Sequence, residues 1–186
     1  MQLLAPAPAY APAGLRALLV SSWVAGASYV YASPARDIIN ALPAGLAWWP
    51  IDCRQAPKAC KFAEVFGRDK NGNGFQQAIA AALPGLAPGL RAGLNGLLLA
   101  GPLLALVQDM RGTWWLYGQD SGLRLPAYAA ESGPEGGETA SAFQLTGRQR
   151  FAARAVALDG PIATVDYGPA SGGTPNPNNT LPFVLA

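Results

Sequence analysis

The segment from Asp69 to Gly74 has the oxygen-bearing side chains with which a calcium-binding loop begins. Its sequence, DKNGNG, places Asp or Asn at the first, third and fifth positions and glycine at the sixth, as an EF-hand loop does. The twelfth position of such a loop supplies a bidentate glutamate, and in this chain that position is Ala80. Because one carboxylate holds calcium poorly, we favour a tight turn over an ion site here.

Histidine is absent from the chain. Its absence excludes Ser-His-Asp and Cys-His catalytic arrangements, His-ligated zinc and an imidazole base near neutral pH. Asp109, Asp120 and Glu131 are the acids from which a carboxylate pair for glycosidic cleavage would be drawn, and we favour solvated turn acids instead. The sequence therefore predicts no catalytic residue, no metal, no cofactor and no enzymatic activity.

The two cysteines of the chain are Cys53 and Cys60. Their spacing does not match the C-x2-C pattern of redox motifs, and two cysteines cannot complete a four-cysteine zinc site. They either form one disulfide across a short loop or remain two buried thiols. We favour the thiols, because a domain of 186 residues does not depend on a single disulfide and nothing else in the sequence indicates secretion.

Two pairs of adjacent tryptophans are present, Trp48 with Trp49 and Trp114 with Trp115. Consecutive residues of a strand point to opposite faces, so one Trp of each pair can enter the core while the other faces outward. An outward Trp on a weakly charged surface is typical of a protein interface, and stacking on sugars or bases is the alternative. We predict that these four residues lie at a subunit interface.

Charged residues make up 13% of the chain, about half of the usual share. The 13 Lys and Arg and 11 Asp and Glu leave a net charge of +2, which provides no basic field for general nucleic-acid binding. A surface this neutral suits a protein that is mostly covered by copies of itself. We therefore expect a homo-oligomer in which edge strands pair between subunits.

The chain divides into three parts by composition. Residues 1–14 form a Pro/Ala-rich arm, residues 15–170 a single β-rich domain, and residues 171–186 a linker followed by an apolar tail. Phe183 and Val184 lie in this tail, and we assign them to the subunit interface as well. The longest uninterrupted apolar run, 94–107, is shorter than the roughly 18 residues of a membrane helix, so no membrane span is expected.

The domain is predicted to be mainly β with one flanking helix, an α+β fold. An N-cap at Asn73 and the following Ala and Gln residues predict a helix over 74–83. Between prolines, 35–42 is predicted to form one or two helical turns, and 84–96 either a loop or a weak second helix. The predicted strands cover 15–32, 61–69, a hairpin over 103–118, an edge or terminal strand over 122–130, and two strands flanking a turn at 146–148.

This order of elements resembles the tail tube proteins of tailed bacteriophages over roughly residues 48–157. The resemblance is carried by the segment FGRDKNGNGFQQAIAAAL, by the hairpin segment with Asp-x-x-Gly-x-Trp from Asp109, and by Phe-x-Leu-x-Gly from Phe143. It implies a small β-sandwich or barrel flanked by a helix, assembling as stacked hexameric rings through which the genome passes. The implied partners are copies of the chain, other tail proteins and transient genomic DNA, in a virion assembled in the host cytoplasm.

Two other classes share parts of this pattern. A capsid decoration or tail-completion protein would have the same composition and β-rich order but would form a different ring or a trimer. A secreted carbohydrate-binding module would use the Trp pairs on sugars and oxidise Cys53 to Cys60.

Overall fold

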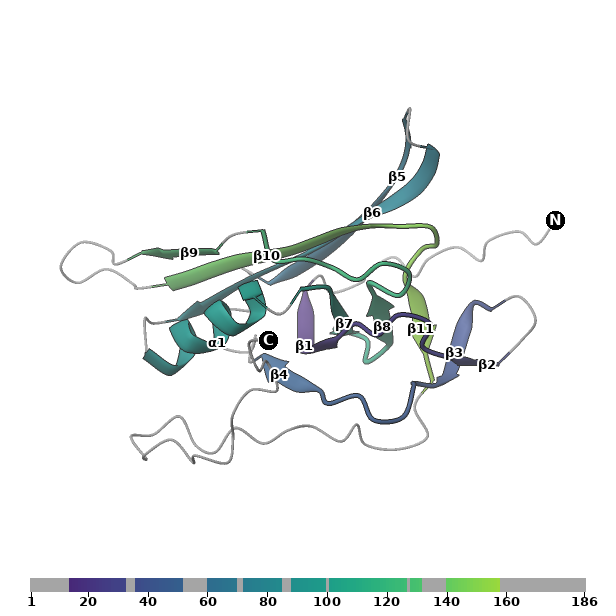
Figure 1. Cartoon of the computed structure of the whole chain (residues 1–186), viewed down its shortest axis with the longest axis horizontal. Helices are drawn as coiled ribbons and strands as arrows, with labels where there is room; N and C mark the ends of the chain where they lie inside the picture. The colour runs from purple at the N-terminus through teal and green to yellow at the C-terminus, as the bar shows by residue number, and fades with distance from the viewer. Residues whose placement is uncertain are drawn as a thin grey trace.

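The structure is a computed structural model that describes residues 14–32, 36–51, 60–69, 72–84, 88–99, 101–126, 128–131 and 140–157. Within these residues the chain is mainly β, with two sheets and one helix, as the sequence predicts. The smaller sheet lies over the larger one, and the helix lies beside both (Figure 1). Most of residues 1–14, all of residues 171–186 and Cys53 lie outside the described part of the chain.

The larger sheet has seven strands in the order β2-β3-β11-β8-β7-β1-β4. Its pairs are antiparallel except for β11 with β3, which run parallel. The strands are β1 (Leu15–Ser22), β2 (Val30–Tyr31), β3 (Ile38–Ala41), β4 (Trp49–Ile51), β7 (Leu103–Asp109), β8 (Trp114–Tyr117) and β11 (Arg154–Val156). The predicted hairpin is confirmed as β7 and β8, and the predicted opening strand is divided into β1 and β2.

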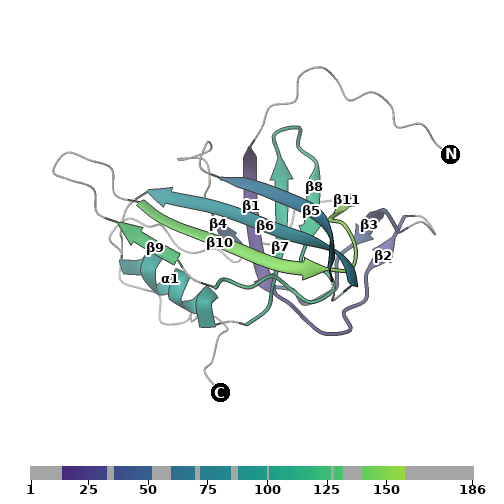
Figure 2. The same cartoon turned by 90° about the horizontal axis from the view of Figure 1, so that it is seen from above.

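The smaller sheet has four strands in the order β5-β6-β10-β9, and every pair in it is antiparallel. The strands are β5 (Lys61–Asp69), β6 (Gly72–Pro84), β9 (Tyr128–Glu131) and β10 (Ala140–Gln149). Seen from above, they cross the central strands of the larger sheet at a steep angle (Figure 2), which is a recognised way for two sheets to pack face to face. The prediction of a strand over residues 61–69 is confirmed.

Strand β7 is buried on both faces. Leu103, Ala105 and Val107 point into the core between the two sheets, together with Ile79 of β6 and Leu145 of β10. The alternate residues Leu104 and Leu106 point into a second core on the far side of the larger sheet. This far-side core also holds residues from the segment between β1 and β4, namely Trp23, Tyr29, Tyr31, Leu42, Leu46 and Trp48.

The prediction of a helix over residues 74–83 is wrong, because this segment lies in strand β6. β6 pairs with β5 over residues 72–80 and with β10 over residues 75–84, so its middle residues 75–80 are paired on both sides. Gln77, Ile79 and Ala81 are buried on the inward face at the two-residue period of a strand. Tertiary pairing therefore overrides the helix propensity of Ala and Gln.

The helix instead forms immediately downstream, as α1 (Pro88–Leu99). Proline is favoured in the first turn of a helix, where its missing N–H has no partner to lose. Beyond the last turn, Gly101 has a positive φ of 76°, a conformation in which glycine often ends a helix. The sequence left this segment open between a loop and a weak helix, and the helix is found.

Two further local predictions are wrong. The predicted turn at 146–148 lies inside strand β10, where Gly147 passes so close to the neighbouring loop that an added Cβ would lie 2.7 Å from the carbonyl oxygen of Gly122. Glycine marks a close backbone approach here and not a turn. The predicted helical turns over 35–42 are replaced by β3, because Ile39 is fully buried in the far-side core between β2 and β11.

Candidate assembly surface

Strand β5 is the longest edge strand among the described residues. It has nine residues, whereas the other sheet edges β2, β4 and β9 have two, three and four. An edge strand presents a row of backbone N–H and C=O groups that can pair with another chain, and proteins usually shorten or charge such edges. β5 carries four charged residues, Lys61, Glu64, Arg68 and Asp69, but its Val65 and Phe66 are 63% and 50% exposed. No strand among the described residues pairs with the free side of β5.

The base of β5 is held firmly by polar contacts. Oε2 of Glu64 accepts hydrogen bonds from Nε2 of Gln77 at 2.8 Å and from the backbone N–H of Ala153 at 2.7 Å. Oε1 of the buried Gln77 accepts from the backbone N–H of Gly118 at 3.0 Å. Burial and the Glu64 carboxylate raise the pKa of Tyr117, whose ring meets that of Phe62 edge-on. The edge strand is thereby fixed to both sheets at its base.

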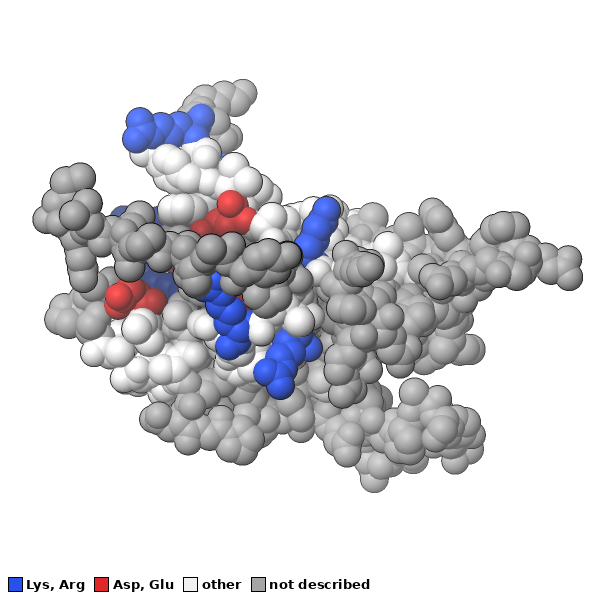
Figure 3. Space-filling view, turned by 180° about the vertical axis from the view of Figure 1, so that it is seen from behind, with Lys and Arg blue, Asp and Glu red and all other residues white. Residues whose placement is uncertain are grey.

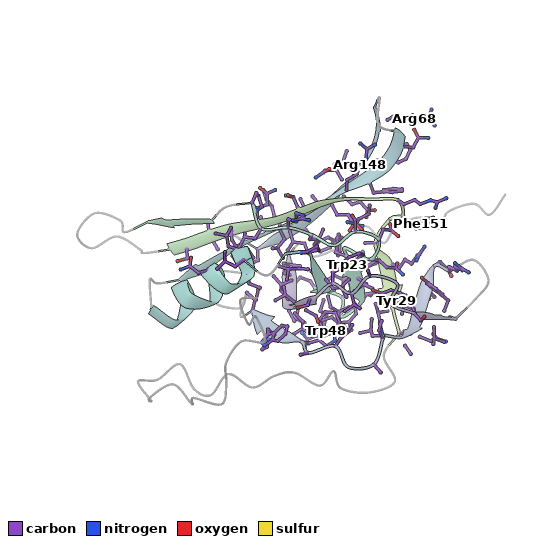
Figure 4. The ribbon with its side chains drawn as sticks, in the orientation of Figure 1. Trp23, Tyr29, Trp48, Arg68, Arg148 and Phe151 are labelled. Atoms are coloured by element: carbon purple, nitrogen blue, oxygen red, sulfur yellow. The ribbon has the colours of Figure 1, made fainter. Side chains whose placement is uncertain are left out.

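The far ends of β5 and β6 project beyond the larger sheet as a hairpin (Figure 1). Phe66 and Phe75 are cross-strand partners on it, with ring centres 5.2 Å apart. The guanidinium carbon of Arg68 lies 5.8 Å from the Phe66 ring centre, and the guanidinium of Arg148 donates to the carbonyl of Gly72. A basic side chain stands near the tip (Figures 3 and 4). The hairpin keeps its shape through its own ring and guanidinium contacts.

The outward face of the smaller sheet carries small and uncharged side chains over most of its area. Parity along the strands places Ala78 and Ala80 of β6 and Ala142, Gln144 and Thr146 of β10 on it. Charged residues of this face lie toward its ends, as with Lys61 at the start of β5. The face is therefore smooth and close to neutral along the middle of the sheet.

The two edges of the smaller sheet run in opposite directions. Three antiparallel pairings separate β5 from β9, so the two edge strands are antiparallel to one another. If one copy follows the next by a rotation about an axis along the strands, β9 of one copy would meet β5 of the next in antiparallel orientation. The sheet can therefore continue from copy to copy without a break in its alternation.

The structure corrects the prediction of an outward Trp at positions 48 and 49. Trp49 is buried in the core between the sheets and Trp48 in the far-side core, with exposures of 5% and 3%. The predicted alternation is present, but both faces of the larger sheet are covered here. Trp114 and Trp115 are half-buried and alternate between the same two cores, with Nε1 of Trp115 donating to Oδ2 of Asp109 at 3.0 Å.

The acidic residues that the sequence singled out have separate structural roles. Oδ1 of Asp109 accepts from the backbone N–H groups of Arg111 and Thr113, both at 2.9 Å, and closes the turn between β7 and β8. Oδ2 of Asp120 accepts from the backbone N–H groups of Arg150 and Phe151. Glu131 ends strand β9. The interpretation as turn acids holds for Asp109 and Asp120.

Cys60 is a buried free thiol, and its Sγ lies 3.9 Å from the carbonyl oxygen of Ala82, to which it donates. No group of three or more His, Cys, Asp or Glu residues that could hold a metal ion occurs among the residues that the structure describes. In the same residues, no helix has the length and apolar character needed to cross a membrane. Phe183 and Val184, the other predicted interface residues, lie outside the described part of the chain.

The exposed residues of the projecting hairpin were not singled out by the sequence. Phe62 and Phe66 lie on one face of β5, opposite Ile79 and Phe75 of β6. Phe62 packs against the core, but Phe66 is half exposed. The long apolar alternation of β5 was the only sequence signal for this edge. The sequence of β5 does not show how far the opposing sheet extends.

No protein-family model matches this sequence, and no curated protein and no solved structure matches it either. The functional argument therefore rests on the residues and the geometry described above.

Proposed function

We propose that this protein is a non-enzymatic virion structural protein that self-assembles into stacked hexameric rings, forming a bacteriophage tail tube through which the genome passes. The single observation that carries this proposal is the long, open β5 edge with its exposed Val65 and Phe66. A soluble monomer normally protects such an edge against other chains. A nine-residue edge with no partner strand among the described residues fits a chain that pairs with its own copies.

The antiparallel relation of β5 and β9 supports a closed ring. A head-to-tail contact between different edges of identical subunits generates a ring when the rotation closes, and closure pairs the two edges that make the contact. In a ring of the smaller sheets, each β5 pairs with β9 of the neighbouring copy. The tail-tube type of sandwich that the sequence resemblance implies is part of this proposal.

The neutral outward face of the smaller sheet supports a channel wall. A genome must slide through a tail tube, and each phosphate contact made by a Lys or Arg side chain strengthens the hold on nucleic acid. Small uncharged residues such as Ala78, Ala80 and Ala142 make no charged contact with phosphate groups. We assign this face to the lumen and the larger sheet to the outer wall, where other tail proteins would bind.

The burial of Trp48 and Trp49 weakens the alternative of a carbohydrate-binding module. A ring that stacks on a sugar must present its face to solvent, and both of these indoles are packed in cores. The two remaining tryptophans of the predicted pairs are half-buried. We therefore keep the virion proposal, with location in the phage tail after assembly in the host cytoplasm.

The test compares two substitutions of valine by lysine in the full-length protein. Val65→Lys puts a charge on the open β5 edge, and Val24→Lys puts the same charge at a 51% exposed position outside the strands. We expect Val65→Lys to weaken self-association at least tenfold in sedimentation velocity, with Val24→Lys unchanged. Both should keep the far-ultraviolet spectrum of the wild type. Normal assembly of the Val65→Lys protein would contradict the proposed edge contact.

A further inference from the structure

The last turn of α1 exposes two leucines. Leu98 and Leu99 are 40% and 67% exposed, whereas Leu97 packs against the core between the two sheets. No basic residue stands in this last turn, so no side chain of the turn offsets the partial negative charge that a helix carries at its C-terminus. We call Leu98 and Leu99 the helix patch. It is apolar and lies at the negative end of the helix dipole.

The projecting hairpin carries an apolar surface with a cation beside it. Phe66 is half exposed, and its ring centre lies 5.2 Å from that of Phe75, its cross-strand partner. The guanidinium carbon of Arg68 lies 5.8 Å from the Phe66 ring centre, on the same face of β5 by the two-residue period of a strand. We call these three residues the hairpin patch. Its apolar rings and its positive charge complement the helix patch.

Both patches lie on the side of the smaller sheet that faces the larger one. Phe66 shares its face of β5 with Phe62, and Phe62 packs against the core between the sheets, as Leu97 does. Two views place α1 on this side, along the edge that β9 forms with the adjoining end of β10 (Figures 1 and 2). The order β5-β6-β10-β9 separates the two edges by about 14 Å. The patches therefore border opposite edges of one sheet and would meet only between copies.

The proposed pairing of β9 with β5 of the next copy leaves the hairpin patch beyond the end of β9. β9 has four residues and β5 has nine. If β9 pairs with the first four residues of β5, the rest of β5 extends past Tyr128, where β9 begins, because the two strands are antiparallel. Phe66 and Arg68 belong to this remainder. The next copy therefore needs a further element on the Tyr128 side of β9 to cover them.

The end of α1 lies on that side of β9. The chain passes from α1 into β7 at Leu103, whose bridge partner is Leu123. The following residue, Arg124, pairs with Thr146 of β10, three residues past the β10 residue that pairs with Tyr128. The pairing of β9 with β5 would therefore set the helix patch of one copy against the hairpin patch of the next.

We propose that the helix patch of one copy docks on the hairpin patch of the neighbouring copy in the ring. Leu98 and Leu99 cover the rings of Phe66 and Phe75, and the Arg68 guanidinium lies at the C-terminal end of the helix, where a cation is favoured. The contact is head-to-tail, since its two surfaces are different. The inference rests on the proposed ring and adds a side-chain contact to the pairing of its strands.

The first experiment places opposite charges at Leu99 of the full-length protein. We expect Leu99→Lys to weaken self-association at least tenfold in sedimentation velocity, because the new cation would face Arg68. Leu99→Glu should weaken it less, and in an Arg68→Glu chain the order of the two variants should reverse. Met110→Lys is the matched control, since Met110 is 41% exposed in the turn between β7 and β8, and it should associate as the wild type does.

Two results of this comparison would overturn the contact. The first is a Leu99→Lys protein that associates as the wild type does. The second is an order of the two Leu99 variants that Arg68→Glu leaves unchanged, because the charge facing the helix patch would then not be Arg68. All variants should keep the far-ultraviolet spectrum of the wild type, since the substituted side chains are exposed.

The second experiment separates this contact from the ring by cross-linking. Copies with Phe66→Cys are mixed with copies with Leu99→Cys, both in a chain whose Cys53 and Cys60 are replaced by alanine, and treated with a short bismaleimide. We expect a cross-linked dimer in the mixture and in neither protein alone.

Electron micrographs of the same samples show which proposal fails. Cross-linked dimers without rings would contradict the tube and leave the contact standing. Rings without cross-linked dimers would contradict the contact and leave the tube standing. A chain that stays monomeric and forms no cross-link would contradict both.

Discussion

Tyr29 is a half-buried tyrosine whose buried hydroxyl has no hydrogen-bond partner among the described residues. It lies against the far-side core, near Trp23 and Trp48 (Figure 4). Burial raises the pKa of Tyr29 to about 12, with smaller contributions from Tyr31 and Asp120. The neutral form is favoured because a buried phenolate loses its hydration. The stability of the far-side core therefore depends on pH in the alkaline range, through the protonation of Tyr29.

We predict that the folded protein loses stability as the pH rises from about 10 to about 12, and that Tyr29→Phe reduces this loss. The unfolded tyrosine releases its proton near its ordinary pKa of 10.0, whereas the folded one holds it until about 12. The folded state thus binds more protons in this window, so raising the pH favours unfolding. Urea unfolding at a series of pH values measures the slope. An identical slope in Tyr29→Phe would show that this residue does not contribute.

Gly147 gives a prediction at the level of the strand. In β10 an added Cβ at this position would lie 2.7 Å from the carbonyl oxygen of Gly122 and 3.0 Å from Cδ2 of Leu123. Because backbone must move to relieve this contact, we expect Gly147→Ala to lower the free energy of unfolding by about 1–3 kcal/mol. Gly67 of β5 has no heavy atom within 4 Å of its virtual Cβ, so Gly67→Ala is the matched control and should not destabilise. Equal stability of the two variants in denaturant would refute the close approach.

The sequence predicted correctly those elements whose local residue pattern agrees with the pairing that they have in the fold. The β7–β8 hairpin combines apolar strands with the turn at Gly112 and the cap at Asp109, all of which are local signals. β6 was mispredicted because Ala and Gln favour a helix, and only its pairing with β5 and β10 makes it a strand. Residue types decide such a segment only when its partners are known.

The sequence led us to expect an assembly surface, but it did not indicate which residues would form it. Low charge indicated a protein covered by its own copies, but the tryptophans chosen for the interface proved buried or half-buried. The alternation of a strand predicts that Trp48 and Trp49 point to opposite faces of the sheet. Whether the far face of the larger sheet is covered, as it is by residues such as Leu42 and Leu46, depends on the tertiary structure. The exposure of the β5 edge likewise depends on where the sheets end.

The C-terminal tail gives a prediction for the whole assembly. We expect deletion of residues 181–186 to leave the chain folded, with an unchanged far-ultraviolet spectrum, and to weaken assembly, because Phe183 and Val184 are proposed to dock on a neighbour. The ten-residue Gly/Pro/Asn linker from Ser171 has a reach of roughly 16–19 Å, enough to contact an adjacent subunit. Unfolding of the truncated chain would place the tail in its own core, and normal assembly would show the tail to be dispensable.

The whole molecule combines a weakly charged sequence, a long edge strand without a described partner, and two edges of the smaller sheet that are antiparallel to one another. These features support the proposal that the chain assembles with its own copies. In a monomer the β5 edge and the Phe66–Phe75 pair of the hairpin would stay in water, which is an aggregation hazard. In the proposed ring, the four residues of β9 from the neighbouring copy would cover part of the β5 edge.

Negative-stain electron microscopy of the concentrated, purified protein tests the central claim most directly. The proposed function predicts rings with a central channel, hexameric in end view and stacked into tubes in side view. A single monomeric species in the micrographs, matched by light scattering across salt and micromolar concentrations, would contradict it.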